Sequence, residues 1–152
     1  MKSLHLPLVF CLALVSAALV SAARPPAGPK GGRILTPDAP HAEFFVEKDR
    51  KVLIAFYDSG LKPLAPGDRV VSAVVETKPD RVKLDFEKTS AGFHSKQPLP
   101  EGNGYTVVVQ IRESVAGRPA NYRGVFNDEE CAGCRRAEYA CTCDEGDGEP
   151  RR

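Results

Sequence analysis

The sequence predicts an all-β protein, an antiparallel immunoglobulin-like β-sandwich of seven or eight strands with a cysteine-rich C-terminal tail. Apolar and polar side chains alternate in several short segments, which is the period of two that a strand imposes on its two faces. Turn-forming Gly, Pro, Asn and Asp residues separate these segments at intervals of roughly 8 to 12 residues, as in sandwiches. No helix-length periodic segment lies between them. A small closed barrel is the alternative architecture.

The first two clear strands form a predicted hairpin. Residues 41–47 alternate, with Ala42, Phe44 and Val46 on one face, so this strand is expected to be half buried. The segment 51–57 is apolar on both faces after its first residue, which predicts a central strand covered on both sides. Polar residues between the two segments predict a tight turn.

Further strand segments follow along the chain, and two weaker ones complete the count. The four clear segments are 69–76, 81–88, 105–112 and 121–127, and the weaker ones are 31–36 and 92–96. In the second of these segments Val82, Leu84 and Phe86 face one way, while charged residues face the other. Valine and aromatic residues are enriched throughout, as strands favour.

The first 22 residues predict a secretory signal peptide. Lys2 gives a positive start, residues 6–20 form an apolar run, and small residues at 20–23 offer a cleavage site. The run is about 15 residues long, shorter than the roughly 20 that span a bilayer, so a retained anchor is the weaker alternative. Cys11 would leave with this segment. We therefore expect a secreted or periplasmic protein without stable membrane insertion after signal cleavage.

Composition divides the rest of the chain. Residues 23–30 are a predicted Pro/Gly linker, 31–127 the β-sandwich domain and 128–152 an acidic, cysteine-rich tail. The tail holds eight acidic residues and four arginines, whereas the domain is basic overall. No basic patch is interleaved with aromatic residues, so nucleic acid is not an expected partner.

Nothing in the sequence indicates an enzyme. It contains neither a nucleophile elbow nor a phosphate-binding loop. The carboxylate pairs Asp38 with Glu43 and Glu101 with Glu113 are best interpreted as solvated surface groups. We expect no catalytic residues.

Four cysteines close together near the C-terminus are the strongest functional signal. They are Cys131, Cys134, Cys141 and Cys143, in the pattern C-x2-C-x6-C-x-C. Four thiolates that converge at about 2.3 Å can hold one soft metal ion, zinc or copper(I). Export favours the alternative of two structural disulfides, because oxidising compartments oxidise free thiols. Redox exchange is a third hypothesis.

Two histidines, His41 and His94, have two alternative interpretations. His41 begins a predicted strand and His94 lies in a weaker one. Each is expected to be an ordinary surface or edge residue. The functional alternative is that they add metal ligands or form a pH-sensitive pair.

Four short stretches carry a resemblance to a known family. They are GGRIL at 31–35, PHAEF at 40–44, VLIAFYD at 52–58 and KPL at 62–64. Together they resemble small secreted or periplasmic β-sandwich domains that accompany heavy-metal efflux systems. The resemblance implies extracytoplasmic handling of copper or zinc, with a metal-efflux component as the protein partner and no catalytic residues. Lys30 stands where the family pattern often has a histidine.

These observations lead to two functional hypotheses. The first is a non-enzymatic metal-handling accessory whose cysteine cluster binds zinc or copper(I). The second is a structural or interaction module whose tail is stapled by two disulfides.

Overall fold

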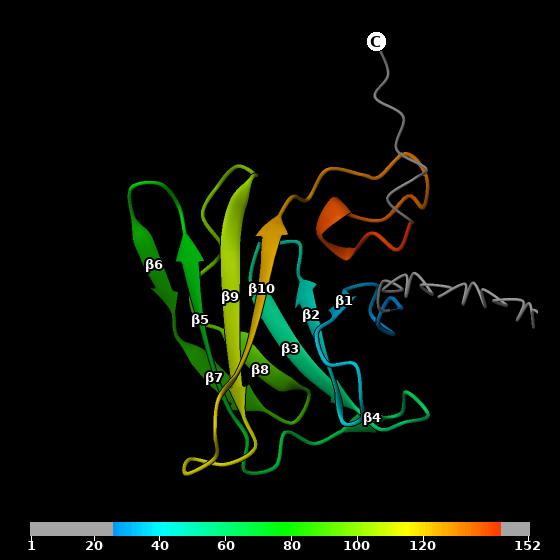
Figure 1. The fold of residues 1–152 in the computed structure, drawn as a ribbon, viewed down its shortest axis with the longest axis vertical. Coiled ribbons are helices and arrows are strands. Elements are labelled where there is room, and N and C mark those ends of the chain that lie inside the picture. Colours follow the sequence, from blue (N-terminus) through cyan, green and yellow to red (C-terminus); the bar gives the residue numbers. More distant parts are fainter. Residues whose placement is uncertain (1–25, 144–152) are drawn as a thin grey trace, which may run out of the picture.

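The computed structural model describes residues 26–143 and shows an all-β fold built from antiparallel strand pairs (Figure 1). The strands are β1 (Arg33–Ile34), β2 (His41–Val46), β3 (Val52–Tyr57), β4 (Pro63–Leu64), β5 (Val70–Glu76), β6 (Arg81–Leu84), β7 (Phe86–Thr89), β8 (Gly92–Ser95), β9 (Tyr105–Arg112) and β10 (Ala120–Phe126). One 3-10 turn, η1 (Glu138–Ala140), follows β10. The predicted all-β class is confirmed.

The strands form two sheets (Figure 1). The first has the order β1-β2-β3-β8-β7, and β4 pairs with the end of β3 beside β8. The second has the order β10-β9-β5-β6. In the second sheet β9 is the long central strand, since it pairs along its length with both β5 and β10.

One apolar core joins the two sheets. Side chains of β2, β3 and β8 from the first sheet pack in a single cluster with those of β5, β6, β9 and β10 from the second. Every residue of β3 is buried, as its two apolar faces predict. Its core face carries Ile54, whereas Leu53, Ala55 and Tyr57 form a second cluster with Phe45 on the other face.

The predicted strand 81–88 is divided in the structure, and this is a correction. The chain leaves β6 in the second sheet and enters β7 in the first, with Asp85 between them. The backbone N–H of Asp85 donates to Gln97 Oε1 at 3.0 Å, and its carbonyl accepts from the N–H of Lys96 at 2.8 Å. The alternation continues through this crossing, so it gave no sign of the break. With the two-residue β4 added, the described strands number ten rather than seven or eight.

A buried carboxylate organises the start of the described chain, contrary to the expectation that Glu43 is solvated. Glu43 is fully buried on β2. Its Oε1 accepts from the backbone N–H of Gly32 at 2.7 Å and of Lys30 at 3.0 Å. Gly28 packs against it so closely that a Cβ there would lie 2.1 Å from the carboxyl carbon. Backbone donors thus satisfy the hydrogen-bonding capacity of the buried carboxyl group, and part of the predicted linker is held against the first sheet.

The predicted signal peptide and the last nine residues lie outside the described residues. Within 26–143, no helix is long and apolar enough to cross a membrane.

Candidate metal centre

The first two cysteines lie in a tight turn after β10. The carbonyl of Cys131 accepts from the N–H of Arg135 at 2.8 Å, and the N–H of Cys131 donates to the carbonyl of Arg136 at 2.7 Å. Arg135 has φ of 59°, a left-handed conformation that lets the chain reverse just after Cys134. An isolated bridge between Glu130 and Ala137 closes the base of the turn.

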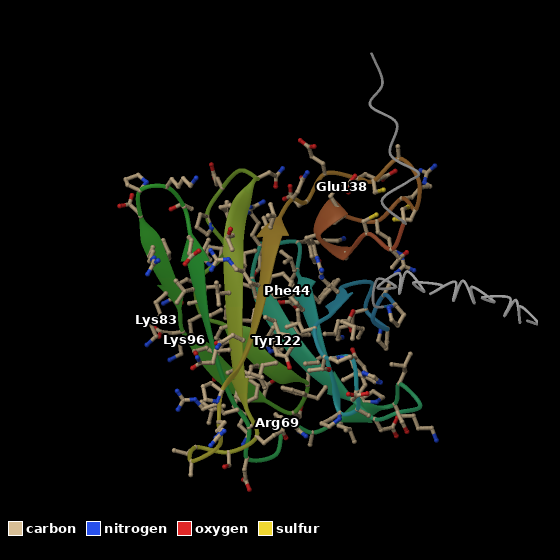
Figure 2. The ribbon with its side chains drawn as sticks, in the orientation of Figure 1. Phe44, Arg69, Lys83, Lys96, Tyr122 and Glu138 are labelled. Atoms are coloured by element: carbon tan, nitrogen blue, oxygen red, sulfur yellow. The ribbon has the colours of Figure 1, made fainter. Side chains whose placement is uncertain are left out.

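The second pair of cysteines follows η1. Cys141 caps this 3-10 turn in an extended conformation, with φ of −62° and ψ of 136°. The N–H of Cys143 lies 3.4 Å from the Sγ of Cys141. The two pairs therefore meet in the loop that Figure 2 shows beside Glu138, where the drawn sulfur atoms gather.

The four sulfur atoms, one from each predicted ligand, lie within 4.8 Å of one another. The Sγ of Cys141 is 3.4 Å from that of Cys131 and 3.7 Å from that of Cys134, while Cys131 and Cys143 are separated by 3.9 Å. A tetrahedral ion with metal–sulfur bonds of about 2.3 Å requires sulfur–sulfur edges of about 3.8 Å. A disulfide requires about 2.05 Å. The group could hold a metal ion, and no pair of these thiols is at disulfide distance.

The sulfurs differ in how readily they lose a proton. Backbone N–H groups of Thr142 and Arg136 lower the pKa of Cys134 to about 6. Hydrogen bonds with Cys141 and Cys134 raise the pKa of Cys143 to about 12, and burial raises the pKa of Cys141. Close thiolates repel each other, which favours a difference in pKa between Cys134 on one side and Cys141 and Cys143 on the other. A bound cation relieves this repulsion, because it replaces the protons.

A glycine makes room for this packing. A Cβ added to Gly133 would lie 2.8 Å from the Sγ of Cys143 and 3.9 Å from that of Cys131. The first distance is too short for a carbon and a sulfur that are not bonded. The two-residue spacer between Cys131 and Cys134 therefore has to be small at its second position.

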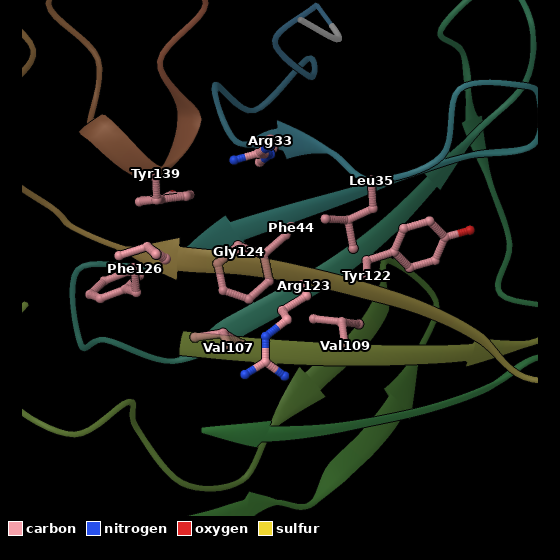
Figure 3. A pocket seen from close by; sticks show the side chains of 11 residues that line it. Arg33, Leu35, Phe44, Val107, Val109, Tyr122, Arg123, Gly124, Phe126 and Tyr139 are labelled. Carbon is pink, nitrogen blue, oxygen red and sulfur yellow. The ribbon is translucent and has the colours of Figure 1, made fainter. Parts of the chain in front are cut away.

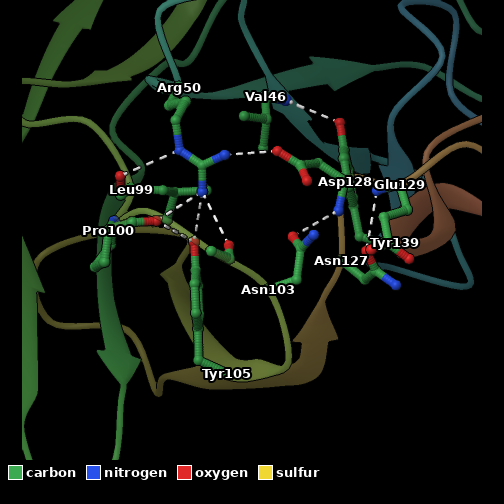
Figure 4. Close-up of polar contacts among 11 residues, drawn as sticks. Val46, Arg50, Leu99, Pro100, Asn103, Tyr105, Asn127, Asp128, Glu129 and Tyr139 are labelled. Atoms are coloured by element: carbon green, nitrogen blue, oxygen red, sulfur yellow. Dashed lines mark hydrogen bonds and ion pairs between the residues drawn. The ribbon is translucent and has the colours of Figure 1, made fainter.

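Tyr139 fixes the cysteine segment to the core. Its hydroxyl accepts a hydrogen bond from the backbone N–H of Val46 at 3.0 Å (Figure 4). Its ring stacks on Phe126 at 5.4 Å between centroids and meets Phe44 edge-on at 5.6 Å. Tyr139 and Ala140 both belong to the main core cluster. The turn that separates the two cysteine pairs is therefore part of the packed domain.

Arg50 holds the start of the same segment (Figure 4). Its guanidinium pairs with Asp128 at 2.5 Å and donates to the carbonyl of Pro100 at 2.6 Å and to the hydroxyl of Tyr105 at 3.2 Å. It also lies over the ring of Phe126 at 5.4 Å. Charge-assisted bonds from one side chain thus join the β2–β3 turn, the β8–β9 loop and the beginning of the cysteine segment.

The histidines do not join the four sulfurs in the candidate group found among residues 26–143. His41 pairs with Tyr57 and His94 with Leu53, on opposite sides of β3. These registers place them about 13 Å apart along that strand. His94 lies instead near Glu47, at 3.7 Å, and Thr89, at 3.2 Å.

The residues that position the centre were less evident in the sequence than the ligands. Tyr139 stands alone as an aromatic residue in an acidic segment, which is a signal for burial. Arg50 lies in an ordinary polar turn, and nothing local distinguishes it.

No protein-family model matches the chain, and searches of curated proteins and of solved structures gave no significant match.

Proposed function

We propose that this chain is a non-enzymatic metal-handling accessory that binds one zinc or copper(I) ion through Cys131, Cys134, Cys141 and Cys143. The observation that carries the proposal is the convergence of four sulfurs within 4.8 Å, with separations close to the edges of a metal–thiolate tetrahedron. Soft thiolate ligands select zinc and copper(I) over hard cations. The four-coordinate arrangement suits zinc best.

Elemental analysis of the chain, refolded under reducing and anaerobic conditions, tests the proposal. We expect about one equivalent of zinc to remain after gel filtration, or of copper(I) when that ion is supplied, since four thiolates complete one tetrahedral site. A Cys131→Ser, Cys134→Ser variant is the control, because it removes half of the ligands. Equal metal content in the two proteins would overturn the proposal.

Counting thiols separates the metal site from the disulfide alternative. Protein isolated from its native compartment without added reductant should show four reactive thiols once the metal is chelated. If none reacts until a reductant is added, the segment is stapled by disulfides and acts as a covalent clasp.

We further propose that the two sheets form an immunoglobulin-like sandwich that serves as the scaffold for this centre. In that fold one sheet has the strand order A-B-E-D and the other contains C, F and G. The order β2-β3-β8-β7 supports the first assignment, and β10-β9-β5, with β6 added at the edge, supports the second. A crystal structure with a different strand order would contradict it.

We also propose that the protein is exported and that its partner is a component of a metal-efflux system. The predicted signal peptide and the resemblance at 31–64 support both. N-terminal sequencing of the exported protein is the direct check, and we expect the mature chain to begin near residue 23. A chain that keeps residues 1–22 would contradict the predicted cleavage.

A further inference from the structure

A small apolar pocket lies where the edges of the two sheets face each other (Figure 3). Phe44 of the first sheet and Leu35, which follows β1, line one side of it, Val107, Val109 and Tyr122 line the other from the second sheet, and Tyr139 lines it from the cysteine segment. Its volume is about 40 Å³. Since one water needs roughly 10 to 15 Å³ on this measure, the pocket suits a group of three or four heavy atoms, the size of one aliphatic side chain.

The pocket lies where Gly124 interrupts the core-facing row of β10. Phe126 on one side of it is buried and Tyr122 on the other is partly buried, so Gly124 occupies the inward position between them. A Cβ built there would meet only Arg33 Nη1, at 3.8 Å. Gly124 is not among the residues with positive φ. Neither backbone strain nor crowding requires this glycine, although glycine weakens a strand and often marks close approach by another chain.

The backbone beside the pocket is free to pair. Among the residues that the structure describes, β10 pairs only with β9. The strand β1 pairs with β2 and, at Arg33, with Ala27 through an isolated bridge. The outer edge of β10 therefore presents N–H and C=O groups without a strand partner over Ala120–Phe126. An extended segment can add to such an edge, with its main chain giving affinity and alternate side chains entering pockets.

A cation at the mouth of the pocket indicates the charge of the occupant. The guanidinium of Arg33 is exposed and makes no ion pair within residues 26–143, whereas Arg123 pairs with Glu76. An exposed guanidinium beside an apolar pocket favours a carboxylate near an apolar group, since charge-assisted hydrogen bonds to carboxylates are strong.

These observations discriminate among occupants. A second copy of this chain would bring the arginines of both edges together, and like charges across a strand pair are destabilising. The chain's own last nine residues are acidic but contain no aliphatic side chain larger than proline.

We propose that this edge binds an extended segment of a partner protein, which adds as a strand to β10. The segment places one aliphatic side chain in the space above Gly124 and, two residues along on the same face, a carboxylate on Arg33. This site lies beyond the cysteine cluster, and its ligand makes no bond to the metal.

A displayed heptapeptide library, selected on the full-length chain, tests this inference. We expect enrichment of peptides with an aliphatic residue two positions from Asp or Glu, the spacing that places both side chains on one face of a strand. Synthetic peptides made from the enriched sequences are then measured by fluorescence anisotropy. The same selection on the Gly124→Val variant is the control. Equal enrichment on the two proteins would overturn the proposal.

Two substitutions locate the binding. Gly124→Val fills the pocket and should weaken the selected peptide by about tenfold or more, while the melting temperature stays equal or rises. Arg33→Gln should weaken it by about tenfold, the equivalent of one charge-assisted bond. Lys83→Gln, on β6 at the opposite edge, is the matched control and should leave affinity unchanged. Unchanged affinity in Gly124→Val would overturn the site.

A third measurement tests the strand itself. Methylation of alternate backbone nitrogens in the peptide should abolish binding in one of the two registers, because it removes the main-chain donors. Strand addition is wrong if methylation in neither register weakens binding and free 4-methylpentanoate competes as well as the peptide does. The site would then be a pocket for small carboxylates.

Discussion

Gly133 lies between the first two ligands and faces the last one. Because a Cβ at this position would come within 2.8 Å of the Cys143 sulfur, either the turn or the ligand has to move to accommodate a side chain. Overpacking of this kind usually costs about 1 to 3 kcal/mol, and about 1.4 kcal/mol within that range already corresponds to a tenfold loss of affinity.

Gly133→Ala should therefore weaken zinc binding by about tenfold or more while the strands stay folded. Competition with a chromophoric chelator measures the affinity, and circular dichroism checks the fold. Ala132→Ser is the control, because Ala132 is exposed in the same turn. Equal affinities for Gly133→Ala and the native chain would mean that Cys143 is not held against this turn in the metal-bound protein.

At the scale of single elements, β3 is the strand with no solvent side. Ile54 is fully buried in the core between the sheets, whereas Lys83 lies exposed on β6 (Figure 2). Truncation of a buried isoleucine leaves a cavity in addition to the lost transfer free energy.

Ile54→Ala should lower the free energy of unfolding by roughly 2 to 5 kcal/mol, and Lys83→Ala should change it by less than about 0.5 kcal/mol. Denaturant melts of both variants under the same conditions measure the difference. Similar values would contradict the separation of a core face from a wet face on which the strand assignments rest.

The ends of the longer strands could be predicted from the sequence, whereas the crossing from one sheet to the other could not. Alternation predicted β2, β3, β5, β9 and β10 within a residue or two of their observed ends. It could not locate the break at Asp85, because the same alternation serves two strands in different sheets. The short β4 has too few residues for any period to appear.

The candidate site could likewise be predicted only where it depends on residues that are close in sequence. The cluster of four cysteines could be predicted because these residues are close in sequence and their arrangement depends on local turns. The burial of Glu43 could not be predicted, because it depends on backbone N–H groups 11 and 13 residues away, whose direction no side-chain pattern encodes. The role of Arg50 could not be predicted for the same reason, because its side chain contacts residues 50 to 78 positions away in the sequence.

On the scale of the whole molecule, Tyr139 couples the cysteine segment to the domain. It lies between the two cysteine pairs, and it packs on Phe44 and Phe126 from different sheets. Metal binding that orders the cysteine segment should therefore stabilise both sheets by mass action.

Chelation of the metal should lower the melting temperature of the native chain by about 5 °C or more, since a loss of about 2 kcal/mol is expected to have that effect in a domain of this size. Tyr139→Ala should reduce this shift to less than half, because it uncouples the segment from the core. Differential scanning calorimetry with and without chelator measures both. Tyr122→Ala, outside the cysteine segment, should lower both melting temperatures and preserve the shift. A full shift in Tyr139→Ala would show that another contact transmits the coupling.

The hydrogen bond between Tyr139 and Val46 joins residues 93 positions apart. The surface that receives the tyrosine contains Phe44 of β2 and Phe126 of β10, so it exists only after strands from both sheets have assembled. Long-range contacts of this kind form late, because the loop-closure entropy must first be overcome. We therefore expect the anchored form of the four-cysteine loop to be reached late, so that its completion would report the assembly of both sheets.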